Sequence, residues 1–165
     1  METTMSQVEN LADLLERGFR GGAWHGPALA EALAGVDEAK AAARPLAGAH
    51  SIWEIVNHLT VWNEVPRRRL DGERLQNLPP ERDWPPADDL SAGAWRAAVA
   101  ALAAAHAALH ARVLELADGQ LDDPVAGSDA TVRGMLLGIL QHNAYHAGQI
   151  VLLHKAPGAP AGARP

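Results

Sequence analysis

Apolar residues recur at helical spacing in four long segments of the chain. Val8, Leu11 and Leu15 share one face of the first segment, and Ile55 and Leu59 share one face of the second. The pattern predicts long helices over residues 6–20, 51–71, 91–117 and 128–155, and short helices over 27–34 and 37–43. No segment has the alternation that is typical of a strand.

Capping residues and breakers set the expected boundaries of these helices. Ser51 begins the second long helix with Glu54 three residues later, which is the spacing of a capping box. Pro66 is expected to kink or shorten that helix. Ser128, Asp129 and Thr131 are alternative caps for the last long helix. Four prolines between residues 78 and 89 predict a long crossover between the second and third long helices.

The chain has 165 residues, enough for one domain, and Ala and Leu dominate its apolar content. This composition favours helix over sheet. We therefore expect an all-α fold, a four-helix bundle that forms a single domain over residues 1–156. The segment 157–165, rich in Pro, Gly and Ala, is expected to be a disordered tail.

Charge and cysteine content exclude several classes of function. The net charge of −6 argues against a nucleic-acid partner, and the basic cluster Arg67–Arg69 is interpreted as a solvated helix end. The absence of Cys excludes disulfides and thiolate ligands, so any metal must bind nitrogen or oxygen. No signal-like segment or stretch of membrane-spanning length is apparent, so we expect a cytoplasmic protein with no membrane partner.

Two of the histidine pairs have the four-residue spacing that stacks side chains on one face of a helix. They are His106 with His110, and His142 with His146. Two imidazoles one turn apart can bind the same ion, although such pairs are often ordinary packing residues. Neither pair is followed by the Glu of a zincin protease, and spacing alone does not separate the two pairs.

Position relative to the apolar faces favours the second pair. His142 and His146 lie on one flank of the apolar face of the last helix, at the border of the predicted core. His58 has the same border position on the second long helix. Burial of imidazoles there requires partners, and a metal ion would be one. We predict that His58, His142 and His146 bind one metal ion, and that His106 and His110 are packing or interface residues.

Other residues near these ligands are candidates for supporting roles. Glu54, Asn57, Asn143 and Gln149 are close in sequence to the histidines, and Gln149 is the best placed to orient a ring. An ordinary surface amide is the alternative interpretation of Gln149. Trp53 and Trp62 are expected to line a pocket or to pack in the core. No catalytic acid, base or organic cofactor is assigned.

Two sequence motifs resemble those of a known family. The run Gly48–Leu59 (GAHSIWEIVNHL), followed by Trp62, resembles the second-helix motif of the DinB-like (DinB/YfiT) superfamily. The run Gly138–Ile150 (GILQHNAYHAGQI) resembles the last-helix motif of that superfamily and is the more specific of the two.

The resemblance implies an up-up-down-down four-helix bundle in which His58, His142 and His146 match the metal triad of the family. It also implies a homodimer. Several relatives transfer small thiols such as bacillithiol or mycothiol, or use them as isomerase cofactors.

These expectations lead to a functional hypothesis with two alternatives. Three neutral imidazoles leave open positions on a divalent ion, which can activate a bound thiol or water. We expect zinc or nickel, and manganese and iron remain open. The main hypothesis is a metal-dependent transferase that joins a small thiol to an electrophilic substrate. The alternatives are a non-catalytic dimeric bundle with a structural or sensory metal, and a metal-dependent hydrolase.

Overall fold

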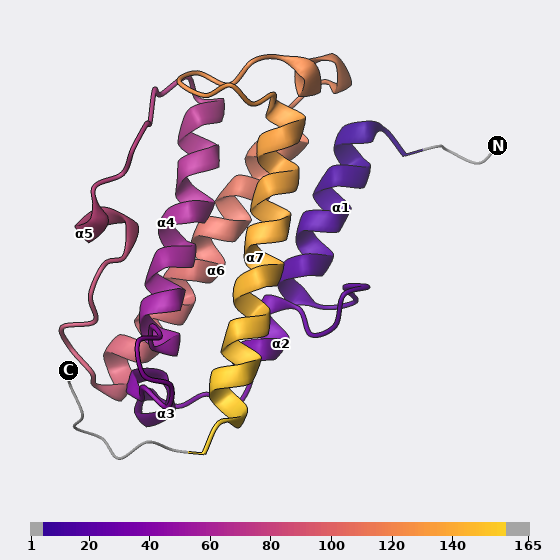
Figure 1. Cartoon of the computed structure of the whole chain (residues 1–165). Coiled ribbons are helices and arrows are strands. Elements are labelled where there is room, and N and C mark those ends of the chain that lie inside the picture. The colour runs from indigo at the N-terminus through magenta and orange to yellow at the C-terminus, as the bar shows by residue number, and fades with distance from the viewer. Residues whose placement is uncertain (1–4, 158–165) are drawn as a thin grey trace.

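The computed structural model describes residues 5–157, and four long helices packed side by side make up most of it (Figure 1). These are α1 (Gln7–Arg20), α4 (Ile52–Leu70), α6 (Ala92–Leu114) and α7 (Val132–Lys155). The short elements are α2 (Leu29–Leu33), α3 (Glu38–Ala42), α5 (Pro80–Asp83) and the 3-10 helix η1 (Asp118–Asp122). The described residues contain no strand beyond an isolated bridge at Pro124 and Thr131, which confirms the all-α class.

The predicted caps begin the helices as expected. The Ser51 hydroxyl accepts a hydrogen bond from the backbone N–H of Glu54, and the Glu54 carboxylate accepts one from the backbone N–H of Ser51. Of the three candidate caps for α7, Thr131 caps the helix by accepting from the N–H of Gly134. Pro66 does not end α4, which continues to Leu70. The expected tail lies outside the described residues from residue 158 onward.

The directions of the four long helices differ from the expectation. Helices α1 and α7 run one way, and α4 and α6 run the other way (Figure 1). Arg133 donates to Gln7 where α7 and α1 both begin, and Arg112 donates to Asp71 where α6 and α4 both end. The up-up-down-down prediction is therefore wrong, because the successive directions are down, up, up and down.

The connections explain this arrangement. The crossover between α4 and α6 travels the length of the bundle, so these two neighbours run parallel (Figure 1). The segments before α4 and after α6 stay at one end of the bundle, so each joins antiparallel helices. The predicted long crossover is thus confirmed.

Two apolar clusters form the core. One surrounds Trp53, Leu59 and Trp95 near the start of α4, and the other surrounds Leu109 and Leu136 near the end of α6. Between the clusters, α4 and α7 bury polar residues where they face each other, namely His58, Asn63, Asn143 and His146. A polar layer therefore interrupts the apolar core of the bundle.

Helix α6 corrects the expectation that no stretch reaches the length of a membrane span. Among the described residues, it is the one helix that is long and apolar enough, by length and composition, to cross a membrane. Its hydropathy derives largely from alanine, and it packs on α1 and α4 through residues that include Leu102 and Leu109. A core helix passes the same test, so this is weak evidence for a span.

Candidate metal centre

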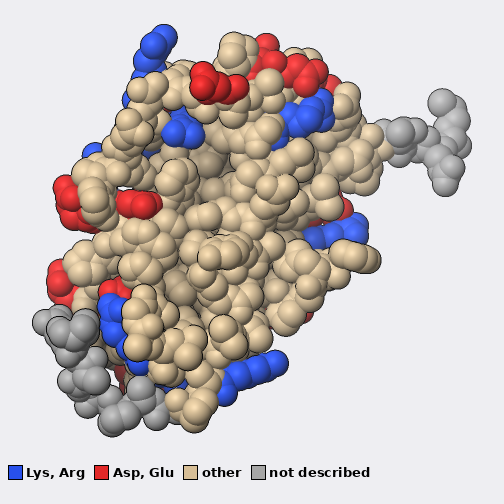
Figure 2. All heavy atoms as spheres, viewed as in Figure 1, with Lys and Arg blue, Asp and Glu red and all other residues tan. Residues whose placement is uncertain are grey.

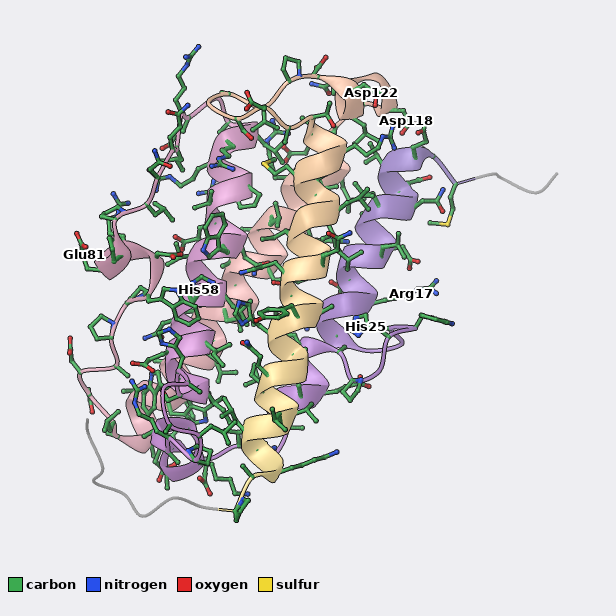
Figure 3. All side chains as sticks on the ribbon, in the orientation of Figure 1. Arg17, His25, His58, Glu81, Asp118 and Asp122 are labelled. Atoms are coloured by element: carbon green, nitrogen blue, oxygen red, sulfur yellow. The ribbon has the colours of Figure 1, made fainter. Side chains whose placement is uncertain are left out.

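The three predicted histidines meet between α4 and α7. His58 extends from α4 towards α7 (Figure 3), where its Nε2 lies 3.0 Å from Nε2 of His142. Nε2 of His146, one turn further along α7, lies 3.2 Å from the same atom. Within the part of the chain that the structure describes, this is the one group of three or more potential metal ligands.

Hydrogen bonds on the far side of two rings fix their orientation. Nδ1 of His58 lies 2.7 Å from the backbone oxygen of Asp83, and Nδ1 of His146 lies 2.7 Å from Oε1 of Gln149. Both oxygens can only accept, so each Nδ1 carries the proton and donates it. The Nε2 lone pairs of both neutral rings therefore point into the space shared with His142.

This donor set fits a divalent cation. Nitrogen ligands at about 2.0–2.1 Å from a tetrahedral ion are separated by roughly 3.3 Å, close to the two Nε2 separations here. Without a cation, a single proton on Nε2 of His142 can satisfy one inward lone pair but not both. Nδ1 of His142 is buried and has no partner among the described residues. The inward Nε2 lone pairs thus lack enough protein donors and match the needs of a metal ion, whereas Nδ1 of His142 gains no partner from an ion at that position.

Burial holds the rings neutral. Desolvation, followed by the repulsion of His146 and His58, lowers the pKa of His142 to about 4. Desolvation also lowers the pKa of His146 to about 4, against the opposing effect of the Gln149 hydrogen bond. The pKa of His58 is lowered too, mainly by burial. Protons therefore compete weakly for the Nε2 lone pairs at neutral pH.

The crossover supplies residues that the sequence pattern did not identify. Asp83, at the end of α5, accepts from Nδ1 of His58 through its backbone and from Nε1 of Trp62, at 2.6 Å, through its carboxylate. The indole of Trp84 lies between the rings of His50 and His58, nearly parallel to both, with centroid distances of 3.6 and 3.8 Å. A tryptophan within an otherwise polar, proline-rich segment was the available signal for this role.

The four residues that were candidates to support the histidines make different contacts. Gln149 bonds a site histidine as predicted. Asn57 instead donates to the carbonyls of Pro85 and Pro86 and so holds the crossover, while Glu54 serves the cap of α4. Asn143 faces Asn63, and neither bonds a histidine.

Trp53 and Trp62, each expected either to line a pocket or to pack in the core, have different surroundings. Trp53 packs against Trp95 in the core, and Trp62 lines the cavity beside the histidines. Trp53 is therefore a core-packing residue, and Trp62 forms part of the pocket wall.

The competing pair does not form a comparable cluster. His106 is fully buried, its Nε2 lies 3.1 Å from Oε2 of Glu16, and its ring stacks on Phe19. The His110 ring lies 6.2 Å away, centroid to centroid. These contacts agree with the interpretation of His106 as a packing residue.

A cavity of about 330 Å³ opens beside the histidines. His58, His142, Trp62 and Asp83 line one part of it. The rest is lined by Pro66, Arg69, Ser128, Ala130, Met135, Gly138 and Ile139. The cavity is large enough to hold a small organic molecule next to the Nε2 atoms.

The buried rings predict an acid-sensitive fold. In the unfolded chain their pKa returns to about 6.5, so the unfolded state binds more protons between pH 6.5 and about 4. The free energy of unfolding of the metal-free protein should fall by several kcal/mol as the pH drops through that window, because each of the two rings contributes about 1.4 kcal/mol per unit of its pKa shift. Urea unfolding in the presence of a chelator, repeated at several pH values, measures this fall in the free energy of unfolding. The His142→Gln variant should show a smaller fall over the same pH range, and an equal fall would contradict the role of the His142 ring in the acid sensitivity.

Comparison with known proteins agrees with the motifs and the geometry. The family model described as the DinB superfamily matches residues 23–150, which contain all three histidines and the crossover. The comparisons with curated proteins and with solved structures found no match. The family match covers most of the chain and includes both motif-bearing helices. The chain belongs to the DinB superfamily.

Proposed function

We propose that this protein binds one divalent metal ion through His58, His142 and His146 and acts as a metal-dependent transferase for a small thiol. The observation that carries the proposal is the convergence of three Nε2 atoms, together with a cavity that two of the three histidines, His58 and His142, line. The cluster of described residues contains three ligands and no fourth. Structural zinc sites normally have four protein ligands, so this set favours a site with an open position.

The residues of the chain have distinct parts in this function. Asp83 and Gln149 hold the rings of His58 and His146 with their lone pairs inward. Trp62 and Trp84 cover the rings and limit the access of water to them. A divalent ion held there supplies a positive charge that stabilises a thiolate, the nucleophilic form of a thiol, near neutral pH.

Two alternatives use the same site. An open position also suits a hydrolase, in which water replaces the thiol. A structural or sensory metal in a non-catalytic bundle requires no substrate. Zinc or nickel is the proposed metal because imidazole ligands suit both, and manganese and iron are the alternatives. The experiments below distinguish these functions.

We also propose a cytoplasmic homodimer, with the outer face of α7 as the contact. Gln141, Tyr145, Gly148 and Leu152 follow one another along this face, and the Tyr145 and Leu152 side chains are 64% and 60% exposed. Figure 2 shows no charged side chain over the middle of this area. A Cβ at Gly148 would meet nothing within 4 Å, yet glycine costs a helix about 0.5–1 kcal/mol relative to alanine. Close approach of a second backbone would account for that glycine.

Elemental analysis tests the metal proposal. The purified protein should contain one divalent ion per chain, and His58→Ala or His146→Ala should lose it. Gln149→Leu keeps the ligands but frees the His146 ring, so its metal affinity should fall by roughly 10–100-fold. His110→Ala is the matched control and should retain full metal. Equal metal content in all four variants would contradict the assignment.

A conjugation assay tests the reaction. The metal-loaded protein should join a small thiol to an electrophile such as an aryl halide or an epoxide, measured by mass spectrometry of the product. His142→Ala should lower the rate at least about 100-fold, since it removes a ligand of the proposed ion. A fully loaded protein with no conjugation across a broad panel would contradict thiol transfer. Ester hydrolysis by the same sample would then favour a hydrolase, and a lower melting temperature on chelation without any activity would favour a structural metal.

Sedimentation tests the dimer. The wild-type chain should sediment at twice the monomer mass, and Gly148→Arg should sediment as a monomer because the new side chain blocks the contact. Ala107→Arg places the same charge on the exposed face of α6 and should remain a dimer. Dissociation of the α6 variant alone would assign the interface to α6 instead.

A further inference from the structure

One arginine of the basic cluster faces the cavity rather than solvent alone. Arg69 lies on the flank of α4 that carries His58, Trp62 and Pro66, and all four line the same cavity. Residues spaced by four, four and three positions fall on one face of a helix. The eleven steps from His58 to Arg69 correspond to roughly 16 Å along the helix axis. The cavity therefore has the histidines towards one end and a cation towards the other.

The three arginines of the cluster have different partners. Arg67 pairs with Asp71, and Arg68 pairs with Glu73. Arg69 has no carboxylate within 4.0 Å among the described residues. The run of three consecutive arginines predicted that all three belong to a solvated helix end. The structure agrees with this prediction for Arg67 and Arg68 but not for Arg69.

The guanidinium of Arg69 is held by a neutral acceptor. Its Nε and Nη2 both donate to the backbone oxygen of Leu75, at 3.1 and 2.6 Å. This leaves Nη1 without an acceptor in the part of the chain described by the structure. A positive charge fixed in place by a carbonyl and left without a counterion is suited to an anionic ligand, and guanidinium favours carboxylates.

The wall between the two ends is mainly apolar. Trp62, Pro66, Met135 and Ile139 line it, and a Cβ added at Gly138 would meet nothing within 4 Å. The one acidic lining residue, Asp83, uses its carboxylate to accept from Trp62 at the histidine end. It therefore does not neutralise Arg69. An extended hydrocarbon chain would fit against this wall.

We propose that Arg69 binds the carboxylate of the substrate, so that the cavity selects an elongated thiol that carries a carboxylate at its far end. The thiol end of this inference rests on the proposed function, because it requires a metal ion on the three histidines. The carboxylate end depends only on Arg69 and the apolar wall. The two ends can be tested separately.

The test uses 6-mercaptohexanoate and 8-mercaptooctanoate as probes, each compared with the mercaptoalcohol of equal length. Isothermal titration of the cobalt-loaded protein measures binding, and cobalt absorption reports ligation of the thiolate. The longer acids should bind about tenfold or more tightly than their alcohols, as expected for a charged hydrogen-bonded pair. 3-Mercaptopropionate, which is too short to reach Arg69, should show no such advantage over its alcohol.

Variants identify the residue responsible. Arg69→Gln should abolish the preference for the acid and leave the affinity for the alcohols unchanged. Arg67→Gln, two positions away on the same helix, should keep the preference. Arg69→Lys retains the charge and should keep part of it, whereas a general folding defect would reduce the binding of acids and alcohols alike. Equal binding of acid and alcohol by the wild-type protein, or an unchanged preference in Arg69→Gln, would overturn the proposal.

A metal-free arm separates this inference from the proposed function. If cobalt does not bind the histidines, the proposed function fails, and octanoate against octanol on the metal-free protein still tests Arg69. A preference for octanoate that Arg69→Gln removes would support the carboxylate site without the metal. Equal affinity for octanoate and octanol in that arm would overturn it.

Discussion

Three imidazole rings lie where α4 and α7 meet, and burial of a polar ring costs free energy unless its nitrogens are bonded. Two of the rings bond outward, to the Asp83 backbone and the Gln149 amide, and all three direct Nε2 inward. The same burial lowers the pKa of each ring and keeps it neutral. The polar layer therefore interrupts the apolar packing of the bundle and at the same time places three neutral imidazoles in an arrangement that fits a cation.

The crossover is part of this site as well as a connection. Because α4 and α6 run parallel, the chain between them must travel back along the outside of the bundle (Figure 1). On its way it places Asp83 against His58 and Trp84 against the face of the same ring. Asn57 holds it there through two proline carbonyls. A segment needed for topology thus also completes the surroundings of His58.

Helical periodicity and capping residues predicted the helices well, because both depend on residues close together in sequence. Ser51 with Glu54 is an example of such a local signal. The convergence of His58 with His142 was also predicted, since each ring borders an apolar face and the family motifs contain both. The helix directions were not predicted, because they depend on the path of the crossover. The contact of Asp83 with His58 was missed for the same reason.

The arginine cluster shows the limit of sequence patterns on a smaller scale. Arg67, Arg68 and Arg69 are consecutive, so composition treats them alike, and a turn of α4 then directs them to different surroundings. Two of them meet carboxylates within a few residues, and the third meets a carbonyl and a cavity. The difference in surroundings among the three arginines depends on which flank of α4 faces α7. A run of identical residues does not indicate which flank that is.

The separation of the histidines along the chain has a consequence for the time at which the site can form. His58 and His142 are 84 residues apart, and the bond between His58 and Asp83 spans 25. During synthesis from the N-terminus, the first ligand and its crossover partner emerge long before the last helix does. A partly synthesised chain that lacks the last helix has only one of the three rings. The three rings can therefore come together only after the final helix has been made, so a site that uses all three forms late.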